Sequence, residues 1–213
     1  MILLLGASGY LGQAFAAELL RRNLAFLPIS RRDVDYSRFE VLLRFLRERK
    51  LAFLINAAGY IGNPNVDACE YAKAETLLGN AILPLTIAHA CAVAELPWDH
   101  VSTGCIYKGA KVRDESGGWK VEPDLNKPDV RRLFDTEPEV FKGFTEDDEP
   151  NFSFRHPPCS FHNGTKVLTE EAIADSGQVF VWRLRIPFDE FDSPRNSLKQ
   201  SHEIKETNHR PAE

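Results

Sequence analysis

The sequence lacks the cysteine patterns that mark metal sites and disulfide frameworks. Its four cysteines, Cys69, Cys91, Cys105 and Cys159, lie far apart and form no C-x-x-C pair. Zinc sites and disulfide-rich secreted folds depend on such pairs or on regular cysteine spacing, so neither is suggested. No metal ligands are predicted, and apart from Cys105 the thiols are expected to be reduced and inert.

An excess of basic residues and a long apolar run are also missing. The formal net charge is −5, whereas a surface for nucleic-acid phosphates needs clustered Lys and Arg. The N-terminal apolar run, Ile2 to Leu5, is too short for a membrane span and has no basic lead of a signal peptide. We therefore expect a cytoplasmic protein with neither a nucleic-acid nor a membrane partner. The oligomeric state stays open.

Glycines, by contrast, are placed informatively near the N-terminus. The run Ile2 to Leu5 stops at glycines spaced G-x-x-G-x-x-G and passes directly into an amphipathic helical pattern. Gly6 would allow the turn, Gly9 would let the backbone approach a pyrophosphate, and Gly12 would let helix and strand pack closely. The pattern predicts a dinucleotide site at the start of the helix. The alternative is a glycine turn that only shapes an α/β domain.

Further apolar runs alternate with helical patterns. Residues 25–29 and 51–55 predict the second and third strands, and a helix between them follows Ser37-x-x-Glu40, which has the spacing of a capping box. A fourth strand ends near residue 102, and a fifth covers 179–186. Alternation with short connections indicates right-handed crossovers. The predicted fold class is α/β: a Rossmann-like doubly wound parallel sheet.

Two stretches do not fit the alternation. Between about residues 108 and 158 the pattern dissolves into Gly, Pro and charge, which predicts a long loop within a domain that covers residues 1–192. From 193 to 213 the chain is polar and shows no strand signal, so we expect a poorly ordered tail.

Residues that follow the second strand bear on the choice of cofactor. In a dinucleotide fold this strand ends beside the adenosine ribose, where a carboxylate binds the 2′-hydroxyl of NAD and arginines accept the 2′-phosphate of NADP. Arg31 and Arg32 favour NADP(H) over NAD(H), and Asp35 is the nearby acid. A charged turn before a helix is the alternative. After the third strand, the small residues of Asn56 to Gly59 would let a flat ligand lie against the backbone.

The motifs form a set that consists of Gly6 to Gly12, Asn56 to Gly59, Asn63 to Glu70, Ser102 to Ile106, Gly164 to Lys166 and Pro194 to Asn196. The set resembles the extended short-chain dehydrogenase/reductase superfamily. Within it, the chain is similar to the dTDP-4-dehydrorhamnose reductase group and especially to the nucleotide-rhamnose epimerase/reductases, over roughly residues 1–196. Relatives continue through further strands and a segment that closes over the sugar nucleotide. The resemblance therefore implies a chain truncated at its C-terminus and a sheet that is incomplete there.

The resemblance also implies a reaction. In the family, a nicotinamide hydride goes to the 4-keto carbon of a nucleotide-linked 6-deoxy sugar while a tyrosine protonates the carbonyl oxygen. A lysine four residues later binds the nicotinamide ribose, and Lys166 matches it; a Ser or Thr that orients the carbonyl is matched by Thr103. From the residues alone, Thr103 could equally cap a turn and Lys166 could be a helix-surface amine.

The family's tyrosine is replaced here by His162, four residues before Lys166. A neutral imidazole beside an ammonium is a poor acid, so the proton-transfer step is expected to be impaired. A bound water or Tyr107 is the alternative donor, and His162 could also be an ordinary polar residue at a helix start. Cys105 matches an acid/base position of the epimerases, but its partner lysine would be the displaced Lys199. A small buried hydrophobe is the alternative for Cys105.

These observations favour an NADP(H)-binding reductase of a dTDP- or UDP-linked 4-keto-6-deoxy sugar, impaired in its chemistry. The competing hypothesis is a catalytically inactive cofactor-binding regulator or truncated remnant. The predicted catalytic residues are Thr103, Cys105, His162 and Lys166, and the predicted substrate-binding residues are Asn80, Thr103, Arg195 and Asn196. The predicted cofactor-binding residues are Gly6, Ser8, Gly9, Tyr10, Leu11, Gly12, Arg31, Arg32, Asp35, Asn56, Ala57, Ala58, Gly59 and Lys166.

Overall fold

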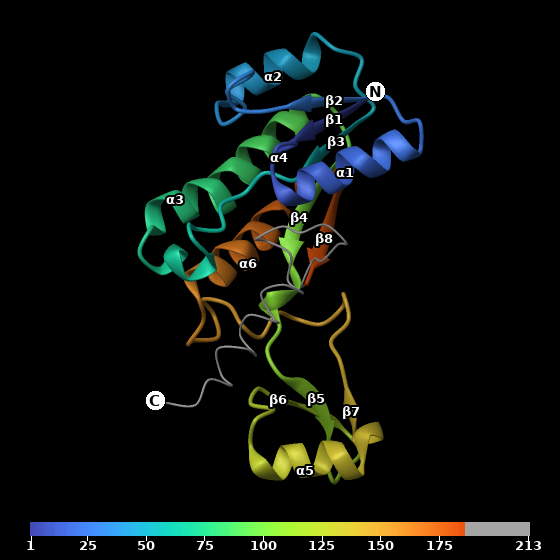
Figure 1. Cartoon of the computed structure of the whole chain (residues 1–213), viewed down its shortest axis with the longest axis vertical. Helices are drawn as coiled ribbons and strands as arrows, with labels where there is room; N and C mark the ends of the chain where they lie inside the picture. The colour runs from blue at the N-terminus through green and yellow to red at the C-terminus, as the bar shows by residue number, and fades with distance from the viewer. Residues whose placement is uncertain (186–213) are drawn as a thin grey trace, which may run out of the picture.

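A five-stranded parallel sheet forms the centre of the molecule (Figure 1). The computed structural model describes residues 1–185. The strand order is β2-β1-β3-β4-β8, and every neighbouring pair is parallel. The strands are β1 (Ile2–Leu5), β2 (Phe26–Ile29), β3 (Phe53–Asn56), β4 (Trp98–Thr103) and β8 (Val179–Leu184). The predicted Rossmann-like fold class is confirmed. The predicted incompleteness at the C-terminus concerns residues outside the described range.

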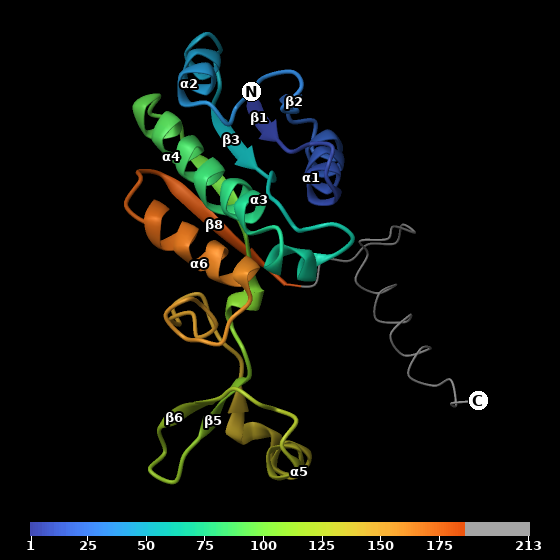
Figure 2. The same ribbon diagram turned by 90° about the vertical axis from the view of Figure 1, so that its left-hand side faces the viewer.

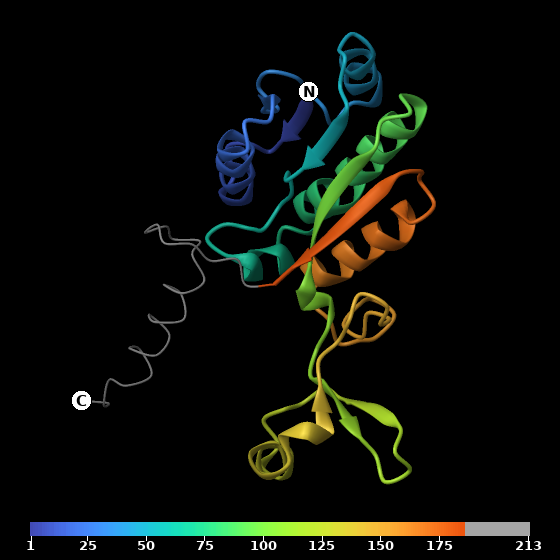
Figure 3. The same cartoon turned by 90° about the vertical axis from the view of Figure 1, so that its right-hand side faces the viewer.

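Helices cover both faces of the sheet, as Figures 2 and 3 show. Alternation along β1 explains the two layers, because successive side chains of a strand point to opposite faces. Leu3 and Leu5 join the larger core beneath α2 and α4, whereas Leu4 joins Leu19 of α1 on the other face. The helices of the two layers are α1 (Tyr10–Arg21), α2 (Phe39–Arg47), α3 (Lys73–Leu77), α4 (Leu83–Val93) and α6 (Phe161–Ile173).

One long helical stretch runs from Lys73 to Val93. Between α3 and α4 it contains a π-helical segment, η2 (Leu78–Ile82), a feature that often marks functional sites. By length and composition the stretch could cross a membrane. Half of its most apolar part is buried, however, and α4 packs against α2 and α6. These contacts are those of a core helix.

The segment predicted as a long loop contains regular structure, which corrects that expectation. It holds a three-stranded antiparallel sheet in the order β6-β5-β7, which lies apart from the parallel sheet (Figure 3). The sequence signal was weak because the strands are short: in β6, Trp119 and Val121 alternate with Lys120 and Glu122 over only four residues. Trp119 packs under the cations of Arg113 and Lys142 instead of in a core. The elements are β5 (Ala110–Arg113), β6 (Trp119–Glu122), α5 (Pro128–Thr136), η4 (Pro138–Val140) and β7 (Phe141–Lys142).

The predicted capping box before α2 is wrong. Arg38 occupies the N-cap position of α2 and makes no side-chain capping bond. The Ser37 hydroxyl donates a hydrogen bond to Asp35 instead, because both side chains lie in the turn that precedes the helix. Such local side-chain bonds compete with capping in Ser- and Asp-containing turns.

Close backbone approach explains two of the three glycines in the first turn. Gly6 has φ +76°, and a Cβ there would lie 2.6 Å from the Ala58 nitrogen. A Cβ on Gly12 would lie 2.1 Å from the Gly6 carbonyl oxygen. Only glycine fits either position without moving backbone. The strand β1, helix α1 and the chain after β3 therefore meet at their main chains.

We predict that Gly12→Ala lowers the free energy of unfolding by about 1–3 kcal/mol, because its methyl group forces α1 away from β1. Urea denaturation measures the loss. Gly143→Ala is the matched control, since a Cβ at Gly143 meets nothing within 4 Å, and it should change stability by less than about 0.5 kcal/mol. Equal stabilities for the two variants would contradict the packing described for Gly12.

Candidate cofactor site and active site

A cleft of about 1220 Å³ opens at the carboxyl ends of β1 and β3. At β1 the strand order reverses, because β2 lies on one side and β3 on the other. Open α/β sheets bind ligands in the crevice at such a switch point. The predicted site residues that line the cleft are Gly6, Ser8, Gly9, Tyr10, Leu11, Arg31, Arg32, Ala57, Ala58, Gly59, Thr103, His162 and Lys166.

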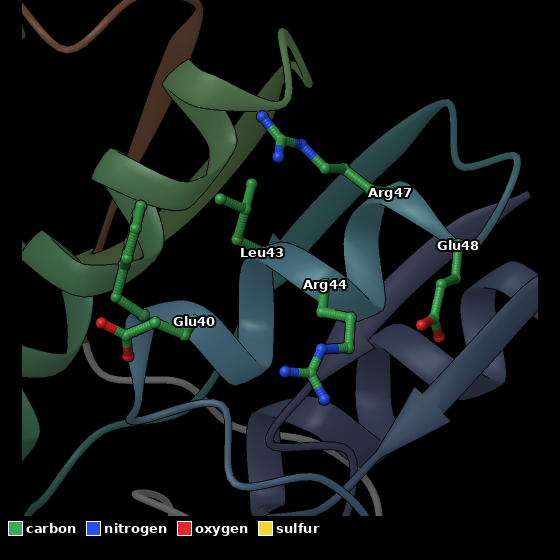
Figure 4. A pocket seen from close by; sticks show the side chains of 6 residues that line it. Glu40, Leu43, Arg44, Arg47 and Glu48 are labelled. Atoms are coloured by element: carbon green, nitrogen blue, oxygen red, sulfur yellow. The ribbon is translucent and has the colours of Figure 1, made fainter.

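A second, smaller hollow of about 360 Å³ lies along α2 (Figure 4). Its walls are six residues of α2 and its C-cap, among them Glu40, Leu43 and Arg47. It contains none of the predicted site residues. One helix forms the whole hollow, so no second element faces a ligand there, and we assign it no role.

The start of α1 suits an anion. Gly9 is the N-cap, and the first turn of α1 carries no acidic side chain. No side chain of the first turn therefore neutralises the positive end of the helix dipole. This end of α1 lies at the cleft, because Gly9 and Leu11 are among the lining residues. The glycine turn thus fits a diphosphate, because Gly6 and Gly9, which line the cleft, have no Cβ atoms to hold a ligand away from the main chain.

Asn56 shapes the cleft from below and does not line it. The side chain is fully buried, and its oxygen accepts from the Ala58 amide at 3.1 Å. Its amide nitrogen lies 3.1 Å from Nδ1 of His100. Both polar ends are therefore used within the protein, and the role predicted for Asn56 in binding the cofactor directly is corrected to one of shaping the turn at Ala57 and Ala58.

Asn80, in the π-helical segment η2, has a similar structural role. Its oxygen accepts from the Tyr60 amide at 2.8 Å, and its nitrogen donates to the Tyr60 carbonyl at 2.7 Å. A ligand would have to displace these bonds, so the prediction that Asn80 binds substrate is not supported by its contacts. Asn80 instead fixes Gly59 and Tyr60 at the cleft wall. Tyr60 was missed from the sequence, because nothing there distinguishes it from Tyr71 on the surface.

Other predicted residues lie elsewhere. Asp35 does not line the cleft, and its carboxylate accepts from the amide and hydroxyl of Ser37. Cys105 is half-buried beside the cleft and is not part of its lining. Gly12 supports the turn from behind, through its packing on Gly6. Arg195 and Asn196 lie outside the described residues, as do Lys199 and the predicted tail.

Lys166 is held in the cleft by a short set of contacts. Its Nζ donates to the Val101 carbonyl of β4 at 3.1 Å, and a Cβ on Gly59 would lie 3.6 Å from the same nitrogen. Burial lowers the pKa of Lys166 to about 8, although the nearby carboxylate of Glu170 acts in the opposite direction. Lys166 is therefore an interior cation beside the wall formed by Gly59, and the alternative of a helix-surface amine is excluded.

Thr103 ends β4 at the rim of the same space. Its Oγ1 accepts from the Cys105 amide at 3.1 Å, as the N-cap of η3 (Gly104–Ile106). A hydroxyl has one proton and two lone pairs, so Thr103 can cap this turn and still donate its proton to a ligand oxygen. The two interpretations of Thr103 from the sequence are therefore compatible.

His162 lies at the start of α6 and is buried. Its Nδ1 is 3.1 Å from the Asn163 side-chain oxygen. Burial lowers the pKa of His162, and the charge of Lys166 lowers it further, while the bond to Asn163 opposes both. The ring is therefore neutral at pH 7.

Tyr107, the alternative donor, does not line the cleft. Its hydroxyl donates to the Asp148 carbonyl at 2.8 Å and accepts from Arg183 at 2.6 Å.

A partly buried ion pair that the sequence did not reveal holds α6 against the sheet. Arg183 of β8 pairs with Glu170 at 2.9 Å, and Ser102 of β4 donates to the same carboxylate. Glu170 is one turn beyond Lys166, so the pair sets where Lys166 meets β4. The sequence shows only an acid in a helix and an arginine in a strand; the contact between them depends on the tertiary fold.

The fold and the cleft define the class: an α/β protein of Rossmann type, with a glycine turn at the switch point and a Thr, His and Lys at the far wall. The sequence profile described as RmlD substrate binding domain matches residues 1–210. The chain therefore belongs to the RmlD substrate-binding domain family. The resemblance inferred from the motifs is confirmed.

One curated relative agrees with this assignment, and two solved structures share the fold. A trifunctional UDP-glucose 4,6-dehydratase/UDP-4-keto-6-deoxy-D-glucose 3,5-epimerase/UDP-4-keto-L-rhamnose-reductase of Arabidopsis thaliana is 31% identical over 158 residues, which are 74% of this chain and 20% of that protein. The UDP-rhamnose synthase of Acanthamoeba polyphaga mimivirus superposes with a TM-score of 0.71 at 20% identity, over 93% of this chain and 60% of that one. A dTDP-4-dehydrorhamnose reductase of Bacillus anthracis in complex with NADP gives 0.63 at 16% identity, over 97% and 60%. The chain thus spans a fifth of the first relative's length.

The buried ammonium of Lys166 generates a pH-dependent stability. In the folded protein its pKa is about 8, below the ordinary 10.5, so between these values the unfolded chain binds more protons and stability rises with pH. We predict that the free energy of unfolding of the wild type rises by roughly 3 kcal/mol between pH 8 and 10.5 relative to that of Lys166→Met, which lacks the amine. Urea denaturation of both proteins across this pH range measures the difference. Lys50→Met, at an exposed position, should follow the wild-type curve. Parallel curves for wild type and Lys166→Met would contradict the burial of a charged amine.

Proposed function

We propose that this chain binds NADP(H) and reduces the keto group of a dTDP- or UDP-linked 4-keto-6-deoxy sugar, with its proton transfer impaired at neutral pH. The observation that carries the proposal is that one cleft brings together the glycine turn, Thr103 and Lys166, which come from three distant parts of the sequence. The family and the reductases named among its relatives support the substrate class.

Each residue of the far wall has a distinct task. Thr103 donates a hydrogen bond from its hydroxyl group to the substrate carbonyl oxygen and so orients the ketone. Lys166 binds the nicotinamide ribose from its place near Gly59, with its carbonyl partner Val101 fixing its direction. The bound nicotinamide supplies the hydride.

Arg31 and Arg32 support NADP(H) rather than NAD(H). Both line the cleft just after β2, and neither forms an ion pair within residues 1–185. Asp33 closes the turn that presents them, by accepting from the amide and hydroxyl of Ser30. Asp35, the acid that would suit a 2′-hydroxyl, is engaged by Ser37. The turn thus offers two guanidinium groups to a 2′-phosphate, while the carboxylates of Asp33 and Asp35 are engaged by Ser30 and Ser37.

We predict that Arg31→Ala combined with Arg32→Ala raises the Kd for NADPH by about 10- to 150-fold, since hydrogen bonds to a charged group contribute about 1.5–3 kcal/mol. The Kd for NADH should change less than threefold. Nicotinamide fluorescence titration measures both constants. The control is Arg38→Ala, an exposed N-cap arginine outside the cleft. An equal loss for NADH and NADPH would contradict recognition of the 2′-phosphate.

The proton step is where the site departs from the reductase pattern. A neutral imidazole replaces the family's phenol, and Tyr107 is held at a distance by Arg183 and the Asp148 carbonyl. A positioned acid or base contributes typically 10²–10⁴-fold to rate. The proposal therefore includes slow reduction at neutral pH.

We predict that His162→Tyr raises the rate of NADPH oxidation with UDP-4-keto-L-rhamnose at pH 7.5 by about 10- to 100-fold, because a phenol near Lys166 can donate a proton there. Loss of absorbance at the nicotinamide band measures the rate. His162→Phe, which introduces the same six-membered ring as tyrosine but no hydroxyl group, is the control and should give no gain in rate. Equal rates for the Tyr and Phe variants would show that proton donation does not limit reduction.

A second candidate function is cofactor binding without turnover. The missing phenol favours it, because the glycine turn and Lys166 could hold the dinucleotide while no acid serves the ketone. NADPH that binds but is not consumed by either sugar nucleotide, in wild type and in His162→Tyr alike, would select this function.

A further inference from the structure

One ring nitrogen of His162 has no hydrogen-bonding partner in the described part of the protein. The side chain is only 8% exposed, yet it belongs to the cleft lining. Nδ1 faces the Asn163 side-chain oxygen at 3.1 Å, whereas Nε2 is buried without a partner. Among the described residues, Trp98 and His100 also have an unpartnered buried nitrogen, but of the three only His162 lines the cleft, so its nitrogen is the one that a bound ligand can satisfy.

The partner of Nδ1 decides which kind of group this is. A carboxamide oxygen only accepts hydrogen bonds, so the contact with Asn163 requires the proton on Nδ1. In the neutral ring the other nitrogen then carries a lone pair. Nε2 is therefore an acceptor, and it complements a hydroxyl rather than a carbonyl oxygen.

The surroundings keep the ring in this neutral form. The elements packed against α6 are η1 (Val66–Glu70), α3, η2, α4, β4 and η3. Their titratable groups, with those of α6 itself, are Asp67, Cys69, Glu70, Lys73, Glu75, His89, Cys91, Asp99, His100, Cys105, Lys166, Glu170 and Glu171. Of these, Lys166 acts on the pKa of His162 by its charge, in the same direction as burial. The pKa of the ring therefore lies below its ordinary 6.5, and the lone pair persists at physiological pH.

We propose that His162 is a proton acceptor for a secondary hydroxyl of the bound sugar nucleotide, so that at neutral pH the cleft is equipped for oxidising an alcohol rather than for reducing a ketone. The inference rests on the proposed function for the dinucleotide and for the substrate class. The neutral ring of His162 favours oxidation at neutral pH, which is the reverse of the reduction that a protonated donor would serve.

The step balances with an oxidised nicotinamide dinucleotide as co-reactant. The hydroxyl O–H bond breaks, and its proton goes to Nε2. The C–H bond of the same carbon breaks, and its electron pair leaves with the hydrogen as hydride to the oxidised nicotinamide. The carbon–oxygen bond becomes a carbonyl, and His162 becomes an imidazolium that returns its proton to solvent. Thr103 donates to the same oxygen throughout.

The proposal predicts opposite pH profiles for the two directions. Oxidation needs the neutral ring, so its rate should be constant above the pKa of His162 and fall about tenfold per pH unit below it. Reduction needs the imidazolium, so its rate should rise about tenfold for each unit that the pH falls toward that pKa. The overall equilibrium is unchanged by the enzyme; the residue sets only the pH range in which each direction proceeds.

The first test reads the ring directly and needs no activity. The full chain is labelled with ¹⁵N-histidine, and the His162 signals are assigned by their loss in His162→Gln. At pH 7.5 the account expects a protonated Nδ1 and an unprotonated Nε2. Asn163→Leu, which removes the acceptor, should shift the ring toward the Nε2–H form. A wild-type ring protonated on Nε2 would overturn the proposal.

The second test measures both directions between pH 5 and 9. The probes are UDP-L-rhamnose with NADP⁺ and UDP-4-keto-L-rhamnose with NADPH. His162→Gln should lower oxidation at pH 8 by at least about 100-fold and abolish the low-pH rise in reduction. His156→Gln, a histidine bonded to Ser153 outside the cleft, should leave both profiles unchanged. Reduction that is fastest above pH 7 would overturn this inference alone. No turnover in either direction with NADPH bound would overturn both this inference and the proposed reduction, and would select cofactor binding without turnover. A chain that binds no NADPH would overturn the proposed function instead.

Discussion

The structure depends on close contact between three stretches of main chain at the end of the parallel sheet. Gly6, Gly12 and the chain after β3 approach so closely that a Cβ at either glycine would overlap backbone atoms. This contact directs the start of α1, with no acid in its first turn, into the cleft. An anionic ligand there meets main-chain donors and the positive end of a helix. The other parts of the site are arranged around this point.

The far wall is set by how α6 meets β4. Lys166 donates to the Val101 carbonyl, and the next strand residue, Ser102, donates to Glu170, which Arg183 neutralises. An isolated buried ammonium is costly, so it is held in place by neighbours that satisfy it. Arg183 also bonds Tyr107 and the Glu146 carbonyl, which connects the outlying antiparallel sheet to the same network. The position of Lys166 is thus coupled to β4, to β8 and, through Arg183, to the segments that flank the antiparallel sheet.

Much of this arrangement could be predicted from the sequence, for identifiable reasons. The glycine spacing and the buried strands are local patterns, and the resemblance to the reductase family pointed to Thr103 and Lys166. The structure places the glycine turn and these two residues in one cleft. The roles of Asn56 and Asn80 could not be predicted, because a polar side chain after a strand looks the same whether it faces a ligand or a backbone amide. The antiparallel sheet was missed because its strands have at most four residues, too few for their alternation to stand out among the surrounding Gly, Pro and charged residues. The partner of Nδ1 in His162 likewise depends on side-chain orientations that the sequence does not specify.

The central claim is that the amides of the glycine turn hold the diphosphate of a nicotinamide dinucleotide. The most direct measurement is an NMR titration of the ¹⁵N-labelled chain with NADPH, followed at individual backbone amides. The account predicts saturable shifts concentrated at residues 6–12 and 57–59, with residues 110–122 of the outlying sheet unaffected. Unchanged resonances of the glycine turn at millimolar NADPH would contradict it.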